Sequence, residues 1–170
     1  MIDYDYVIAA DPGANGALAV LDYNGGFKTW LFATERKKLI SDLPKYLTSA
    51  YIVLEEVHAL YGSSADRTFG FGRNLGHLEG IIEALGGEVD LRVEPELWQR
   101  VVTFPPIKIP SKELPEDERG RAKKDHKEAL KLESIRAAEA AYPGSTRWHD
   151  GIADAVNIAR YGLIMLRGRL

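Results

Sequence analysis

The sequence predicts an α/β fold, a five-stranded mixed sheet flanked by helices. Three observations lead to this class. Five short apolar runs are typical of strands, and longer segments carry apolar side chains at helical spacing. The chain of 170 residues has room for one domain of ordinary size, so we expect residues 1–170 to form a single domain.

Turn and helix signals place the elements along the chain. An Asn-Gly-Gly turn at 24–26 favours positive φ and predicts a tight hairpin, so the first three strands should form an antiparallel meander. Pro44 is an expected irregularity in the first helix. Prolines and charges between 103 and 121 predict an exposed, mobile loop. The expected strands are 6–10, 17–21, 27–33, 51–54 and 89–93, and the expected helices are about 35–49, 67–85, a short segment from 95, 123–142 and 149–166.

Three glycines recur at one-turn intervals in the second helix, at Gly72, Gly76 and Gly80. Each costs about 1 kcal/mol of helix propensity relative to alanine, so the repetition needs a structural reason. Close packing on the sheet and a helix-to-helix contact in a dimer explain it about equally well.

Composition excludes several classes of protein. The chain has no cysteine, which removes disulfides, thiolate nucleophiles and cysteine-rich zinc sites. Its first five residues include two aspartates, unlike a secretory signal, and no apolar run approaches the ~20 residues of a membrane span. We therefore expect a cytoplasmic protein with no membrane partner.

The formal net charge of −3 conceals a basic segment. Between Arg119 and Arg136, seven basic residues stand against three acidic ones. Such a run is either a solvated helix face or, beside a nuclease site, a surface that binds phosphates.

Four carboxylates occupy positions that this fold brings together. Asp11 follows the first strand, Glu55 follows the fourth, and Asp150 and Asp154 lie one turn apart on the last helix. Side chains beyond the carboxyl ends of parallel neighbouring strands lie at one edge of a sheet. Such a cluster suits two divalent cations, Mg²⁺ or Mn²⁺, which can drive hydrolysis of a phosphodiester. The simpler alternatives are that Asp11 belongs to a turn and that Asp150 is a favourable charge at a helix start.

Motifs along most of the chain, from about Val7 to Arg160, resemble in order those of RuvC-like Holliday-junction resolvases, with the phage-encoded branch most similar. The matching segments are 11–13 followed by 16–20, 54–57, 95–98 and 149–155. The resemblance implies a ribonuclease H-like fold, a homodimer, a two-metal carboxylate site, and symmetric nicking of four-way junctions in DNA recombination.

Carried over by position, the resemblance implies that Asp11, Glu55 and Asp154 are metal ligands. Asp150 lies four residues before Asp154, where bacterial members have a ligand three before, and we assign it as the fourth ligand, with His149 a weaker candidate. A basic residue near the site is also a family feature, and Lys127 is our first choice and Lys124 our second. Bacterial members carry an aromatic residue just after the glutamate motif that probes the junction, where this chain has His58 and, shortly after, Tyr61. The expected DNA contacts are Lys123, Lys124, Lys127, Lys131, Arg73, Arg100, His58 and Tyr61.

Three other functions match part of the pattern. An actin-like ATPase or kinase also has an acid and glycines after a strand, but it needs two such domains, and no nucleotide cofactor is expected here. A non-catalytic DNA-binding relative would normally have lost some of the acids, and all four are present. Another ribonuclease H-like nuclease, acting on RNA/DNA hybrids or on a broader range of branched DNA, is separated from a resolvase only by the order of the motifs.

Overall fold

A five-stranded mixed sheet forms the centre of the chain. The computed structural model describes residues 4–56, 65–105, 114–145 and 147–168. In the sheet order β3-β2-β1-β4-β5, the first three strands form the expected antiparallel meander, and β4 and β5 continue it in parallel with β1. The strands are β1 (Tyr6–Ala10), β2 (Ala17–Asp22), β3 (Phe27–Leu31), β4 (Ala50–Glu55) and β5 (Leu91–Val93).

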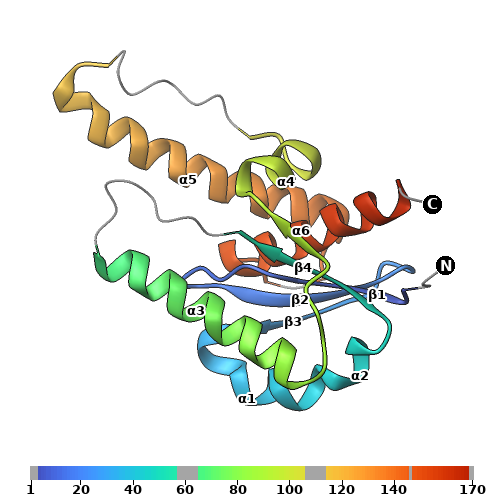
Figure 1. The fold of residues 1–170 in the computed structure, drawn as a ribbon. Coiled ribbons are helices and arrows are strands. Elements are labelled where there is room, and N and C mark those ends of the chain that lie inside the picture. The colour runs from blue at the N-terminus through green and yellow to red at the C-terminus, as the bar shows by residue number, and fades with distance from the viewer. Residues whose placement is uncertain (1–3, 57–64, 106–113, 146, 169–170) are drawn as a thin grey trace.

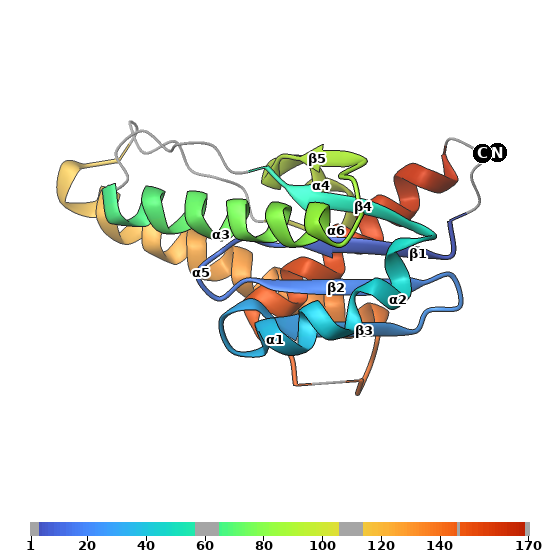
Figure 2. The same cartoon turned by 60° about the horizontal axis from the view of Figure 1, so that its bottom comes forward.

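Helices cover both faces of the sheet (Figures 1 and 2). One face packs against α1 and α3, and the other against α4 and α6, with α5 lying on α6. The helices are α1 (Phe32–Asp42), α2 (Pro44–Leu47), α3 (Ala65–Ala84), α4 (Pro95–Val102), α5 (Glu116–Ala141) and α6 (Asp150–Arg167). In the described part of the chain, every helix is too short or too polar to cross a membrane.

The central strand explains why the sheet is covered on both sides. In β1, Val7 and Ala9 are buried against the α6 side, whereas Ile8 and Ala10 are buried against the α1 and α3 side. Alternate side chains of a strand point to opposite faces, so an all-apolar strand requires a cover on each face. The expected fold class is therefore confirmed.

Two helix boundaries differ from the sequence prediction. The first predicted helix begins at Phe32 and is divided at Leu43, because Pro44 starts a new short helix at its first position. The predicted loop 103–121 is wrong for its last six residues, since α5 already begins at Glu116. Three acidic residues in the first turn, Glu116, Asp117 and Glu118, favour that start through the helix dipole. Residues 106–113 lie outside the described residues.

The glycine ridge of α3 does not pack on the sheet. A Cβ built on Gly72, Gly76 or Gly80 would meet no atom of the described chain within 4 Å, and all three residues are exposed. Of the two explanations from the sequence, close packing on the sheet is therefore wrong.

Gly151→Ala is expected to destabilise the fold, because the added Cβ would lie 1.8 Å from the carbonyl oxygen of Asn15. Overpacking of this kind costs about 1–3 kcal/mol in the free energy of unfolding. Gly120→Ala is the matched control, since a Cβ there has open space and should stabilise α5 by roughly 0.5–1 kcal/mol. Thermal unfolding compares the two, and a melting temperature unchanged in Gly151→Ala would contradict the close approach of α6 to this loop.

Candidate active site

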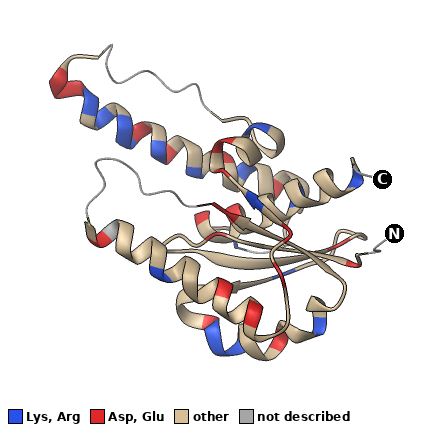
Figure 3. Ribbon diagram, in the orientation of Figure 1, with Lys and Arg blue, Asp and Glu red and all other residues tan. Residues whose placement is uncertain are grey.

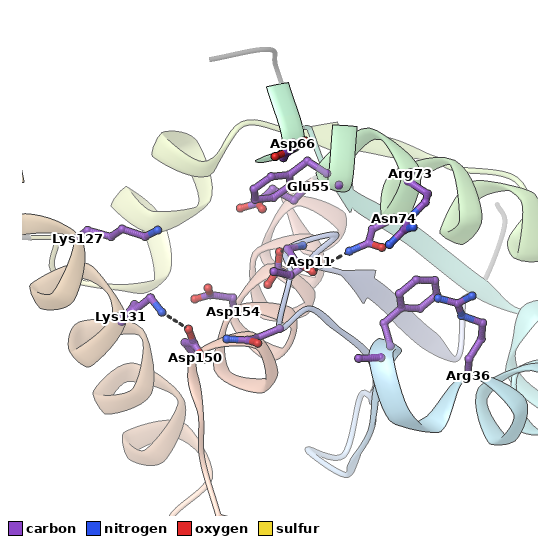
Figure 4. A pocket seen from close by; sticks show the side chains of 18 residues that line it. Asp11, Arg36, Glu55, Asp66, Arg73, Asn74, Lys127, Lys131, Asp150 and Asp154 are labelled. Atoms are coloured by element: carbon purple, nitrogen blue, oxygen red, sulfur yellow. Dashed lines mark hydrogen bonds and ion pairs between the residues drawn. The ribbon is translucent and has the colours of Figure 1, made fainter. Parts of the chain in front are cut away.

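A pocket of about 740 Å³ at the edge of the sheet where β1 and β4 end is lined by the four predicted carboxylates and by Asp66 of α3. Parallel pairing of Ala10 with Leu54 puts Asp11 and Glu55 side by side at that edge. The start of α6 contributes Asp150 and Asp154 from the same side (Figure 4). The structure thus brings together residues from three distant segments of the chain.

The loop from Asp11 to Gly16 is shaped by its glycines. The backbone N–H of Gly13 donates to Asp11 Oδ1 at 2.7 Å, which fixes the rotamer of the carboxylate. A Cβ on Gly13 would lie 2.9 Å from the same oxygen, and one on Gly16 would lie 2.1 Å from the carbonyl oxygen of Asp11. Side chains at these positions would displace Asp11, so the glycines are needed for its placement.

Each of the other carboxylates is held by a separate donor. Trp98 Nε1 donates to Glu55 Oε1 at 2.9 Å, and Ser134 of α5 donates to Asp154. Lys131, also on α5, forms an ion pair with Asp150. Trp98 is 1% exposed, and its indole N–H orients Glu55 in the pocket.

Burial and mutual repulsion raise the pKa of three of the acids. Desolvation is the main cause of the pKa of about 6 at Asp11 and about 7 at Asp154, and the negative charge of neighbouring carboxylates adds to both. Glu55 has a pKa raised well above its ordinary value for the same two reasons. Burial also opposes ionisation of Asp150, but the hydrogen bond and charge of Lys131 lower its pKa overall. Of these four acids, Asp150 is the one that is ion-paired directly with a lysine of the described chain.

The donor chemistry of this pocket fits hard divalent cations. In the described part of the chain, no three His, Asp or Glu side chains converge as they would around an ion. Three of the acids are each bound by a separate donor, Glu55 by Trp98, Asp154 by Ser134 and Asp150 by Lys131. Carboxylate oxygens are nevertheless the ligands that Mg²⁺ and Mn²⁺ prefer. A cation bound in the pocket would favour the ionised forms of Asp11 and Asp154, whose pKa values are raised.

Basic side chains lie on both sides of the carboxylates (Figure 4). Lys127 and Lys131 line the pocket from α5, and Arg36 and Arg73 line it from α1 and α3. Five of the predicted DNA contacts lie on α5 and α3, and three of them line the pocket: Lys127, Lys131 and Arg73. Lys and Arg recur along α5 between acidic residues (Figure 3).

The remaining predicted residues lie elsewhere. Lys123 and Lys124 are exposed on α5 but do not line the pocket, and Lys124 lies 3.9 Å from Glu128. Arg100 is exposed on α4, 3.6 Å from Glu96. His149 places Nδ1 3.7 Å from Asp150 Oδ1 without lining the pocket. His58 and Tyr61 lie outside the described residues.

Sequence reasoning gave too little weight to Lys131 and missed Ser134 and Arg36. Lys131 was expected as a DNA contact only, with Lys127 preferred near the acids, yet it is Lys131 that pairs with Asp150. Its position one turn after Lys127 was a usable signal, since both side chains share a helix face. Ser134 and Arg36 gave no such signal, because their approach to the pocket depends on how helices pack.

Together, this sheet order and these helices define a ribonuclease H-like fold with an acidic pocket at the strand ends. Among solved structures, the chain is similar to two of RuvC from Thermus thermophilus. RuvC in complex with a Holliday junction substrate matches with a TM-score of 0.55 and 13% identity, and a second RuvC structure with 0.52 and 16%. Both alignments cover 95% of each chain. No protein-family model matches the chain, and no curated protein matches it in sequence. The similarity shows a RuvC-like fold.

Proposed function

We propose that the chain is a structure-selective endonuclease that resolves four-way DNA junctions by metal-dependent phosphodiester hydrolysis, nicking two opposing strands. The observation that carries the proposal is the pocket itself, in which Asp11, Glu55, Asp150 and Asp154 meet between basic side chains. Support for the substrate comes from the shared fold with RuvC, which is described in complex with a Holliday junction. The phage-type subclass stays a prediction from the motifs.

In this proposal the four carboxylates hold two Mg²⁺ or Mn²⁺ ions. When bound, such a pair supplies an activated water and stabilises the leaving oxygen during attack on the phosphodiester. Trp98 and Ser134 keep Glu55 and Asp154 oriented toward the pocket through their hydrogen bonds. Lys131 balances part of the charge on Asp150, and Lys127 binds the phosphate backbone.

The decisive experiment compares three labelled substrates: a synthetic four-way junction, the matching linear duplex and an RNA/DNA hybrid. Each is incubated with the chain in Mg²⁺, in Mn²⁺ and in a chelator. Paired nicks in opposing strands of the junction alone, and only with metal, are the expected result. Preferred cleavage of the hybrid, or equal cleavage of flaps and forks, would reassign the chain to another ribonuclease H-like nuclease. Tight junction binding without cleavage in either metal would identify an inactive DNA-binding relative.

Symmetric nicking requires two sites, and we place the contact between two copies on the glycine ridge of α3. A shallow groove of about 330 Å³ runs beside that ridge, and its lining is apolar apart from one histidine. With no side chain at the glycines, a second α3 related by two-fold symmetry has room to approach closely. The groove is lined by Ile40, Gly76, His77, Gly80, Ile81, Ala84 and Leu85.

Gly76→Glu is expected to convert the dimer to monomer, because it places a charged side chain in this groove. Gly120→Glu, the same change on α5 in open space, is the matched control and should remain dimeric. Sedimentation velocity measures the mass of each, and we expect at least a tenfold increase in the dissociation constant for Gly76→Glu only, about 1.4 kcal/mol. A dimer that survives this substitution unchanged would place the contact on another surface.

Ser134→Ala is expected to weaken cleavage by about 10- to 100-fold, the usual cost of removing a hydrogen-bond partner of a metal ligand. The hydroxyl donates to Asp154 and accepts from Asn157 Nδ2 at 3.0 Å, and Asn157 is fully buried. Asn157 keeps its bond to the Ser134 carbonyl oxygen, so the packing of α5 on α6 should persist. Cleavage rates at varied Mn²⁺ concentration measure the effect, with exposed Ser41→Ala as control. Equal metal dependence in both variants would remove Ser134 from the site.

A further inference from the structure

The wall of the pocket opposite the lysines is formed by α1 and α3. Figure 4 shows Arg36, Arg73 and Asn74 on one side of the acids, and Lys127 and Lys131 on the other. Asn74 Nδ2 donates to the carbonyl oxygen of Gly13 at 3.2 Å, which ties α3 to the loop that carries Asp11. The sequence and the resemblance give Arg36 no role.

Arg36 is held in a fixed place relative to Asp11. Its guanidinium carbon lies 4.3 Å from the centroid of the Phe32 ring, and Phe32 is only 3% exposed. The backbone N–H of Phe32 donates to the carbonyl oxygen of Gly16 at 3.0 Å, so the start of α1 is attached to the end of the same loop. A guanidinium stacked on a buried ring loses little further freedom when it binds a ligand.

The Nε–H of the Arg36 guanidinium has no acceptor in the part of the chain that the structure describes. This atom is buried and has no hydrogen-bond partner among the described residues, and neither Arg36 nor Arg73 forms an ion pair with any described carboxylate. Two other arginines differ in this respect, since Arg92 lies 2.6 Å from Glu79 and Arg160 donates to Asn157. A buried donor left without an acceptor is unfavourable, and the flat fork of a guanidinium matches the oxygens of a phosphate.

We propose that Arg36, with Arg73 beside it, binds a backbone phosphate of the nucleic-acid strand that crosses the carboxylates. The inference rests on the proposed function for the path of the strand, and it adds a second phosphate site opposite the one at Lys127. A strand held on both sides of the acids has its intervening phosphodiester positioned over them. The ligand is a phosphodiester within a polynucleotide, as distinct from a free phosphate ion.

The first test observes the Arg36 Nε–H directly by nuclear magnetic resonance of the ¹⁵N-labelled full chain in a chelator, which prevents cleavage. The resonance is assigned by its loss in Arg36→Lys. Titration with a ten-nucleotide oligothymidylate is expected to shift it, and titration with inorganic phosphate at the same ionic strength is expected to shift it only at far higher concentration. An unmoved resonance at saturating oligonucleotide, or an equal response to both ligands, would overturn the proposal.

The second test compares the salt dependence of junction binding in Arg36→Gln and Lys37→Gln, both in an Asp154→Asn background that prevents cleavage. The two variants lose the same charge from neighbouring positions of α1, and Lys37 is exposed and does not line the pocket. Loss of one phosphate contact lowers the slope of log K against log salt concentration by about 0.9. We expect this reduction in Arg36→Gln and less than half of it in Lys37→Gln. Equal slopes would overturn the inference.

The two experiments separate this inference from the proposed function. A chain that cuts no branched DNA, yet shows the oligonucleotide shift at Arg36, would retain the phosphate site and lose the resolvase assignment. A chain that nicks junctions normally, with an unmoved Arg36 resonance, would retain the enzyme and lose this site.

Discussion

Asp154→Asn is expected to bind a four-way junction about as tightly as the wild-type chain and to cut it more than about 100-fold more slowly. Removing a residue that only hydrogen-bonds to a metal ligand lowers metal affinity or activity by about 10- to 100-fold. Loss of the ligand itself should therefore have a larger effect on the cleavage rate. Asparagine keeps an oxygen for the Ser134 hydroxyl, which leaves the contact between α5 and α6 in place. Removing a charge from a crowded acidic pocket also reduces repulsion toward DNA.

Single-turnover cleavage and binding anisotropy, both in Mg²⁺, measure this prediction. Asp125→Asn removes the same charge from α5 at an exposed position, where Asp125 lies 3.9 Å from Arg121, and serves as the control. We expect that control to cut at the wild-type rate. If Asp154→Asn cut within threefold of the wild-type rate, the four acids would not be the catalytic site, whatever the fold.

The meeting of Asp11 and Glu55 was predictable from the sequence because it follows from strand pairing. Two wholly apolar runs, each followed by an acid, predict buried parallel neighbours, and parallel neighbours end at the same edge. The joint position of Asp150 and Asp154 follows from helical spacing alone. These inferences use periodicity, which is a local property of the chain.

The partners of the acids were not predictable in the same way. Lys131 and Ser134 contact Asp150 and Asp154 because α5 packs on α6, and the geometry of that packing depends on side chains from both helices. Arg36 reaches the pocket because buried Phe32 packs the start of α1 on the sheet, beside the loop that carries Asp11. Each depends on tertiary packing, which overrides local helix signals.

The stability of the chain without divalent metal is expected to fall as pH rises from about 4 to 7. Asp11 and Asp154 have pKa values of about 6 and about 7 in the fold, against 3.8 in the unfolded chain. Between these values the native state binds more protons than the unfolded state, so the free energy of unfolding decreases with pH through that window. Asp42 acts in the opposite direction at acid pH, because hydrogen bonds from Lys28 and Lys45 hold its pKa at about 2. Its contribution is lost as pH falls below 3.8, which places the stability maximum of these three groups near pH 4.

Mg²⁺ or Mn²⁺ should restore the stability that is lost at pH 8. Ions that bind only the folded chain raise its free energy of unfolding by about 2.7 kcal/mol at 100 times their dissociation constant. For a chain of this size, each kcal/mol shifts the melting temperature by roughly 2–4 °C. Calorimetry at pH 5 and pH 8, with and without metal, measures both effects, and NaCl of equal ionic strength controls for screening. Asp154→Asn should melt higher than wild type at pH 8 without metal and should gain less from its addition. A melting temperature that does not change from pH 5 to 8 or on addition of Mn²⁺ would contradict the prediction. It would show that the carboxylates neither repel one another nor bind an ion.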